Sequence, residues 1–164
     1  GTGRRKMLKI VREGCFVVRS SNIIVSFVGF SKFHKFVLFA SHGRFMNRLG
    51  RYPVLVLHTK GRVTGKIRKT PLIYMNSENG YVCVGSFGGS PKHPDWVINL
   101  QNDSEVVVEI CGEKILATGE FVSGSKRTIL WEQLVNFYPG FGYYQSVTFR
   151  CIPVVNFLPK TKHE

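Results

Sequence analysis

The chain has 164 residues, of which 43% are hydrophobic. This length allows one well-buried core and is too short for two, so we expect a single domain. The 23 Lys and Arg residues exceed the 10 Asp and Glu residues and give a formal net charge of +13. This excess disfavours a cationic partner and predicts an anionic one, for which nucleic acid, acidic lipid and a phosphorylated ligand all remain candidates.

Residues 1–32 form a basic and apolar N-terminal extension. Its apolar run, residues 15–30, is interrupted at Arg19 and is shorter than the roughly 20 residues that a membrane-spanning helix needs. The pattern predicts an amphipathic helical region. Two roles stay open for it: packing on the rest of the fold, or peripheral contact with an anionic membrane surface.

The four cysteines are read as buried free thiols. Cys15, Cys83, Cys111 and Cys151 are far apart and form no C-x-x-C pair, and three of the four lie in apolar, strand-like runs. This pattern favours a reducing, cytoplasmic location over a disulfide framework.

The central part of the chain alternates short apolar runs with turn residues. Apolar spacing predicts a helix over residues 31–41, and strands are expected over residues 53–59, 67–75, 81–86, 105–111, 114–122 and 152–158. A short helix follows Pro94 and ends near Gln101. The dipeptide Gly112-Glu113 is typical of a hairpin turn. Six strands with short turns predict a mainly β (α+β) barrel with a few covering helices.

A second helix is expected from Ser123. Its apolar face is predicted to consist of Ile129, Leu130, Leu134 and Val135. Residues 137–144, which follow, are rich in aromatic residues and glycine. This segment fits either plain core filling or a movable aromatic lid over a hydrophobic acceptor.

The first candidate site is the turn between the strands over residues 53–59 and 67–75. Five of the ten residues from 60 to 69 are basic, and Gly61 and Gly65 let the backbone turn tightly and expose its amides. Such a turn is either a solvated surface loop or an anion site. In the second case, three side chains can converge on one anion: Arg62, Lys66 and Arg68.

A second candidate is the segment Ser86-Phe-Gly-Gly-Ser90, which precedes the short helix. Its glycines allow close approach of a ligand, although an ordinary loop fits them equally. Trp96 and Asn99 are three residues apart and share one face of that helix. An apolar ring beside an amide suits a flat heterocycle, and core packing also explains Trp96. The five histidines show no metal-ligand spacing, so no metal site is predicted.

Taken in order, these motifs resemble the deazaflavin-dependent nitroreductase family, whose members are split β-barrels that use the deazaflavin coenzyme F420. The resemblance covers residues 33–159. It rests on Arg48-Leu-Gly50, Pro53-Val-Leu-Val-Leu57, the turn Gly61-Arg-Val-Thr-Gly-Lys-Ile-Arg68 with Thr70-Pro-Leu72, Gly88-Gly89, His93-Pro-Asp-Trp96, Asn99-Leu100, Tyr138-Pro-Gly140, Tyr144-Gln145 and Ile152-Pro-Val154. Val63 departs from the family pattern, because relatives usually have a basic residue there, and Phe87 replaces a lysine of some relatives.

The resemblance implies a split β-barrel of the FMN-binding type over residues 33–164. It also implies transfer of a hydride from reduced coenzyme F420 to an electron-poor small-molecule acceptor, such as a quinone or a nitro compound. A quinone is the preferred acceptor, because an apolar N-terminus and an aromatic pocket both suit a membrane-soluble ring. Split barrels of this kind are often dimeric, so a homodimer is expected.

The site residues that the resemblance implies fall into two sets. The cofactor set contains Arg62, Thr64, Lys66, Arg68, Thr70, Pro71, Leu72, Ser86, Trp96, Asn99 and Tyr144. Within it, Arg62, Thr64 and Arg68 match positions that hold the phosphate and acidic tail of the coenzyme. The catalytic set contains Ser86, Tyr138 and Tyr144, whose hydroxyl groups would hydrogen-bond the acceptor oxygen as negative charge develops on it.

Three alternatives remain at this stage. One is an FMN-binding reductase of the same fold, and another is a lipid-binding or cofactor-binding protein without turnover. Nucleic-acid binding is the third and is disfavoured. It requires basic residues along a face with interleaved aromatics, whereas the basic residues here gather on one tight turn and in the N-terminal tail.

Overall fold

The computed structural model describes residues 48–49 and 51–161 of the chain. The predicted N-terminal extension and the predicted helix over residues 31–41 lie outside the described residues. Within the described part, eight strands form one antiparallel sheet. They are β1 (Arg48–Leu49), β2 (Tyr52–Lys60), β3 (Ile67–Ile73), β4 (Met75–Asn76), β5 (Tyr81–Val84), β6 (Glu105–Ile110), β7 (Glu113–Phe121) and β8 (Val154–Pro159).

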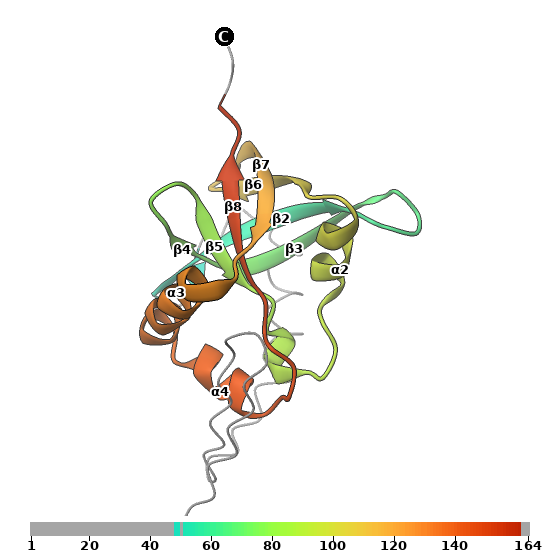
Figure 1. The fold of residues 1–164 in the computed structure, drawn as a ribbon. Coiled ribbons are helices and arrows are strands. Elements are labelled where there is room, and N and C mark those ends of the chain that lie inside the picture. Colours follow the sequence, from blue (N-terminus) through green and yellow to red (C-terminus); the bar gives the residue numbers. More distant parts are fainter. Residues whose placement is uncertain (1–47, 50, 162–164) are drawn as a thin grey trace, which may run out of the picture.

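The sheet curls because its two ends are joined by a single residue. From β3 the strands follow the order β3-β2-β6-β7-β8-β5-β4, and β1 pairs with the start of β2. β3 ends at Ile73 and β4 begins at Met75, so strands at opposite ends of this path are separated only by Tyr74. A flat sheet cannot satisfy that connection, and the strands close into the barrel-like body of Figure 1. The prediction of a mainly β barrel is confirmed.

Four helical segments connect and cover the strands in the described part of the chain. They are the 3₁₀ turn η1 (Phe87–Gly89) and the helices α2 (Asp95–Asn102), α3 (Gly124–Phe137) and α4 (Gly140–Ser146). Figure 1 shows α2 and the pair α3 and α4 on different sides of the sheet. None of the helices in residues 51–161 is long and apolar enough to cross a membrane.

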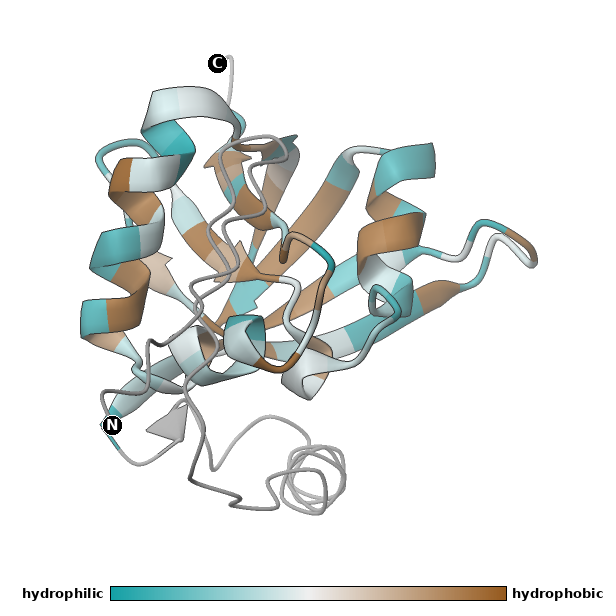
Figure 2. Ribbon diagram, turned by 60° about the horizontal axis from the view of Figure 1, so that its bottom comes forward, coloured by the Kyte–Doolittle hydropathy of each residue, from teal (hydrophilic) through white to brown (hydrophobic). Residues whose placement is uncertain are grey.

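Strands β5 and β8 are buried on both faces. Cys83 and Phe157 pack in one core cluster with Trp96 of α2, whereas Val82 and Val154 pack in a second cluster with Leu134 of α3. Successive side chains of a strand point to opposite faces, so one face meets α2 and the other meets α3 and α4. Figure 2 accordingly shows apolar ribbon in the central strands and along one stripe of the helices.

Two turns differ from the expected positions. The predicted strand over residues 67–75 is divided at Tyr74 into β3 and β4. The turn between β6 and β7 consists of Cys111 and Gly112, one residue earlier than expected, with φ angles of 52° and 83°. Two positive φ values are the mark of the tight turn that suits the twist of a hairpin. Cys111 is therefore exposed, against the prediction of a buried thiol, whereas Cys83 is buried as expected.

The helices after β7 also differ in detail. Ile129 is predicted on the apolar face of α3 and is instead 58% exposed. Arg127 is the buried residue of that turn: it donates a 2.7 Å hydrogen bond to the Ile152 carbonyl, and its guanidinium lies 5.2 Å from the centre of the Trp131 ring. The aromatic segment is not a loop, because residues 140–146 form α4.

Leu134 and Ile129 provide a test of how α3 is held on the sheet. Leu134 is 1% exposed among the side chains of the second core cluster, so Leu134→Ala leaves a cavity there. We expect Leu134→Ala to lower the free energy of unfolding by about 2–5 kcal/mol. Ile129→Ala, on the same helix, is the matched control and should change it by less than about 0.5 kcal/mol. Urea denaturation followed by circular dichroism measures both, and equal effects would contradict the packing described for α3.

Candidate functional site

A groove of about 420 Å³ lies between the β2–β3 turn and α2. Strand β2 and the turn supply one wall, β3 supplies the floor beside it, and the N-terminal half of α2 with η1 supplies the other wall. The lining residues are Thr59, Gly61, Arg62, Val63, Thr64, Arg68, Thr70, Phe87, Pro94, Asp95, Trp96 and Asn99.

The turn that forms one wall is held by its own backbone. The Gly61 amide donates to the Lys66 carbonyl at 2.8 Å, and the Gly65 amide donates to the Gly61 carbonyl at 2.8 Å. Gly65 has a φ of 69°, a conformation that favours glycine. The glycines thus allow the tight turn that the sequence predicted, and they keep Arg62 and Thr64 at the mouth of the groove.

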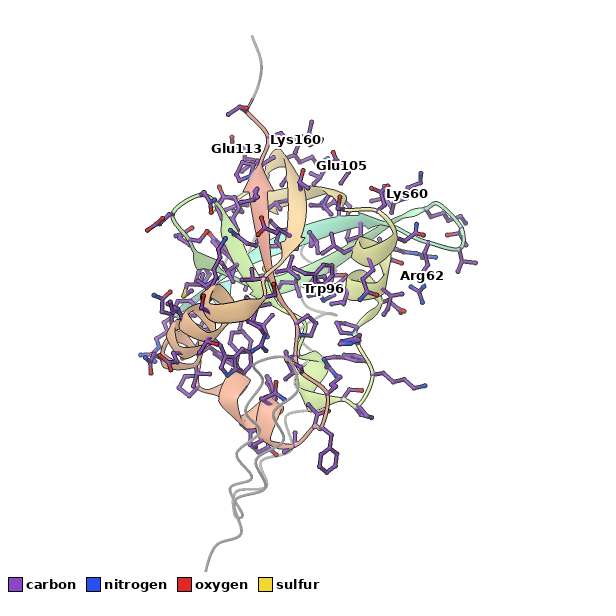
Figure 3. The ribbon with its side chains drawn as sticks, in the orientation of Figure 1. Lys60, Arg62, Trp96, Glu105, Glu113 and Lys160 are labelled. Atoms are coloured by element: carbon purple, nitrogen blue, oxygen red, sulfur yellow. The ribbon has the colours of Figure 1, made fainter. Side chains whose placement is uncertain are left out.

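Strand pairing decides which of the basic side chains reach the groove. Arg68 is opposite Thr59, and both line the groove, whereas Lys69 is opposite His58 on the other face of the sheet. Adjacent residues of a strand point to opposite faces, so the charges of Arg68 and Lys69 serve different sides of the protein. In Figure 3, Lys60 and Arg62 likewise project to opposite sides of the hairpin.

Asn99 joins the turn to α2. Its side-chain oxygen accepts two hydrogen bonds from Arg62, one from the backbone amide at 3.2 Å and one from Nη1 at 2.9 Å. Its Nδ2 donates to Thr59 Oγ1 at 3.4 Å. Asn99 is 3% exposed, so both ends of a buried amide are used to position the groove walls. Asn99 thus acts on the groove through Arg62 and Thr59.

The cations of the groove differ in how far they are neutralised. Arg62 Nη2 lies 3.2 Å from Asp95 Oδ1, an exposed ion pair across the groove. Arg68 has no carboxylate partner within residues 51–161, and the same holds for Lys66. Arg68 therefore offers the groove a full positive charge, whereas the charge of Arg62 is partly balanced.

The lining of the groove also contains apolar residues. Trp96 is buried, with its ring centre 6.2 Å from that of Phe157, and Pro94 and Phe87 lie beside it. Figure 3 shows Trp96 pointing from α2 toward the barrel. A lining that combines an unpaired cation with apolar and aromatic side chains fits a ligand that has a flat ring and an anionic tail.

Phe87 has an unusual backbone. Its φ is 45°, and it is followed by Gly88 and Gly89 with φ values of 63° and 78°. A bulky residue with positive φ is strained, and such strain is held only where the surroundings fix it. Phe87 is 51% exposed and belongs to the groove lining. The segment Ser86-Phe-Gly-Gly-Ser90, a candidate because of its glycines, therefore contributes an aromatic residue to the groove lining.

Tyr138 and Tyr144 form a pair beside this segment. Their hydroxyl oxygens are 3.5 Å apart, and burial together with this contact raises the pKa of Tyr144 above its usual value. Tyr144 therefore stays protonated and can donate a hydrogen bond. The backbone of Tyr144 lies against Gly89, where an added Cβ would come within 2.9 Å of the Tyr144 carbonyl oxygen. The pair thus adjoins η1 and is separate from the groove lining.

The structure places some of the predicted cofactor residues in the groove lining and others outside it. Six of them line the groove: Arg62, Thr64, Arg68, Thr70, Trp96 and Asn99. Pro71 lies on the opposite face of β3, and Leu72 packs against the first core cluster. Lys66, Ser86 and Tyr144 are outside the lining. Thr59, Pro94 and Asp95 were not predicted. The strand register would have found Thr59, because it is the partner of Arg68.

Comparisons with known proteins identify the family of the chain. The family model described as F420H(2)-dependent quinone reductase matches residues 32–159. An F420H(2)-dependent quinone reductase of Mycobacterium tuberculosis is 34% identical over 129 residues, which are 76% of this chain and 86% of that protein.

Two solved structures share the fold. One is an F420-H2 dependent reductase, FDR-A, with 33% identity and a TM-score of 0.59 over 64% of this chain and 93% of that chain. The other is described as a domain-swapped dimer and has 28% identity and a TM-score of 0.61 over 79% of this chain and 98% of that chain. With a family model that spans most of its length and a relative of this similarity, the chain belongs to the F420H(2)-dependent quinone reductase family.

Proposed function

We propose that this F420-dependent oxidoreductase binds the coenzyme in the groove between the β2–β3 turn and α2 and reduces a quinone. The observation that carries the proposal is the polarity of the groove. Arg68, which has no ion-pair partner among the described residues, and the apolar Trp96 both belong to its lining. This polarity matches a coenzyme with a flat ring and a phosphate-bearing acidic tail.

The residues present fit that coenzyme. Arg68 and the exposed Thr64 would hold the phosphate and the acidic tail, because a guanidinium and a hydroxyl both donate to phosphate oxygens. Asn99 fixes Arg62 in the same groove lining. The apolar wall at Trp96 and Pro94 would contact the ring and exclude water from one side of it. When bound, the coenzyme supplies the hydride, and the protein supplies orientation and electrostatics.

The tyrosine pair is proposed to orient the acceptor. Tyr144 is protonated, lies within 3.5 Å of the Tyr138 hydroxyl and adjoins the segment that carries Phe87. Either hydroxyl can donate to a quinone oxygen as negative charge develops on it. Ser86, at the start of the same segment, is a third candidate donor. An aromatic pair suits a quinone ring better than it suits a strongly polar acceptor.

Assembly and location are proposals as well. A structural relative is a domain-swapped dimer, and we propose that this chain also forms a homodimer. A quinone is membrane-soluble, so we further propose that the protein is cytoplasmic and meets its acceptor through peripheral membrane contact. The basic residues of the N-terminal extension support this contact.

Arg68 and Lys69 allow a test of the groove with a matched pair of substitutions. Arg68→Gln removes the unpaired charge from the groove, so the dissociation constant for coenzyme F420 should rise roughly tenfold or more. Lys69→Gln removes the same charge from the opposite face of β3 and should change it less than about twofold. Quenching of coenzyme fluorescence measures both. Equal effects would show that general attraction to a basic protein accounts for the binding.

The wild-type protein should distinguish coenzyme F420 from FMN. We expect saturable quenching of F420 fluorescence under conditions in which FMN binds at least roughly tenfold more weakly, since the family model is that of F420H(2)-dependent enzymes. Tighter binding of FMN would overturn the assignment of the cofactor.

The tyrosine pair should affect turnover more than coenzyme binding. Tyr144→Phe and Tyr138→Phe each remove one hydroxyl and keep the ring, so kcat/KM for a soluble quinone should fall roughly tenfold to a hundredfold, with the coenzyme dissociation constant unchanged. Steady-state kinetics with reduced coenzyme measures the fall. Tyr143→Phe, on the same helix, is the control. Unchanged quinone turnover in both variants would remove the pair from the mechanism.

A further inference from the structure

Arg150 holds the segment that carries Phe87 from both sides. It lies between α4 and β8, and its guanidinium donates to the carbonyls of Gly85 at 3.0 Å, Ser86 at 2.7 Å and Ser90 at 2.7 Å. A further contact of 3.1 Å joins Nη1 to His93 Nδ1. These four partners bracket the 3₁₀ turn Phe87–Gly89 on its N-terminal and C-terminal sides.

Arg150 has no carboxylate partner among the described residues. Its half-buried guanidinium is satisfied by backbone carbonyls and one imidazole instead. Burial and the charge of Arg150 lower the pKa of His93, so the ring is neutral near pH 7 and Nδ1 can accept the hydrogen bond. A planar group with several fixed donors suits this task, whereas a lysine ammonium cannot reach all of the carbonyls at once.

The position of Arg150 is itself fixed. Gln145 of α4 donates from Nε2 to the Arg150 carbonyl at 2.8 Å and accepts from the Ile152 amide at 3.0 Å. Gln145 is buried. Hydrogen bonds therefore connect α4, through Gln145 and Arg150, to the segment around Phe87.

The segment needs such support, because its backbone is strained. Phe87 has a φ of 45°, and relaxation of this angle would move the ring that lines the groove. Gly89 packs tightly against α4, where an added Cβ would lie 2.4 Å from Val147 Cγ2. The turn has two backbone hydrogen bonds of its own, from the Gly89 amide to the Ser86 carbonyl at 2.9 Å and from the Ser90 amide to the Phe87 carbonyl at 3.1 Å. Arg150 adds the contacts that hold the residues on both sides of the turn.

We propose that Arg150 is a positioning residue, which keeps Phe87 in place as a wall of the groove and thereby sets coenzyme affinity. The inference rests on the proposed function, since it assigns the groove to the coenzyme. Arg150 itself lies outside the groove lining and acts through the backbone of residues 85–93.

Trypsin provides a readout of the segment that does not require the coenzyme. Lys92 is exposed and lies between two residues that Arg150 contacts, Ser90 and His93. In Arg150→Gln, cleavage of the Lys92–His93 bond should be roughly tenfold faster than in the wild type, because the segment opens more often. Arg150→Lys keeps the charge and should show a similar increase. Mass spectrometry of early digestion products identifies the bond.

Arg127→Gln is the matched control. Arg127 is also buried and also donates to a backbone carbonyl, that of Ile152, but it forms no hydrogen bond with residues 85–93 of the described chain. The Arg127→Gln substitution should lower the melting temperature without accelerating cleavage of the Lys92–His93 bond. If Arg127→Gln and Arg150→Gln accelerated this cleavage equally, the effect would reflect general destabilisation, and the proposal would be overturned.

A double-mutant cycle tests whether Arg150 acts through Phe87. Phe87→Ala and Arg150→Gln should each raise the dissociation constant for coenzyme F420 roughly fivefold, and the double variant should be little worse than either. Multiplication of the two effects would overturn the proposal, because the residues would then act independently. The proposed function fails separately, and visibly, if the wild-type protein itself does not quench coenzyme fluorescence.

Discussion

The side-chain amide of Asn99 connects the two elements between which the groove exists. It ties Arg62 of the turn and Thr59 of β2 to a helix that is itself packed into the barrel through Trp96. The hairpin of β2 and β3 extends beyond the rest of the sheet in Figure 1 and needs a support of this kind. A buried amide with partners at both ends cannot give up one of them without cost, so the width of the groove depends on this contact.

Much of the architecture follows from local pattern. The apolar runs that form β2, β5, β6, β7 and β8 are predictable as strands. Short runs rich in β-branched and aromatic residues between turn residues are typical of strands. The basic turn is recognisable as a candidate site for the same reason, since Gly61 and Gly65 allow only a tight connection. Arg62, Arg68 and Trp96 therefore reach the groove as expected.

What the pattern missed depends on tertiary contacts. Burial of Arg127 in place of Ile129 requires the Ile152 carbonyl, which belongs to a distant part of the chain. Thr59 lines the groove because of the strand register, and Asp95 lines it because of the way α2 docks. The residues next to them in the sequence do not predict either position. The first position of the hairpin turn is Cys111, a residue type that gives no hint of a positive φ.

The length of the basic turn determines how β2 pairs with β3. The pairing of Lys60 with Ile67 places Arg68 inside and Lys69 outside, and the turn between these partners holds that pairing in place. A slip by a single residue would exchange the two side chains between the faces of the sheet. Which cations reach the groove thus depends on odd and even positions in β3 more than on the number of cations in the turn. Relatives that differ in the length of this turn should differ in coenzyme preference even where their net charge is the same.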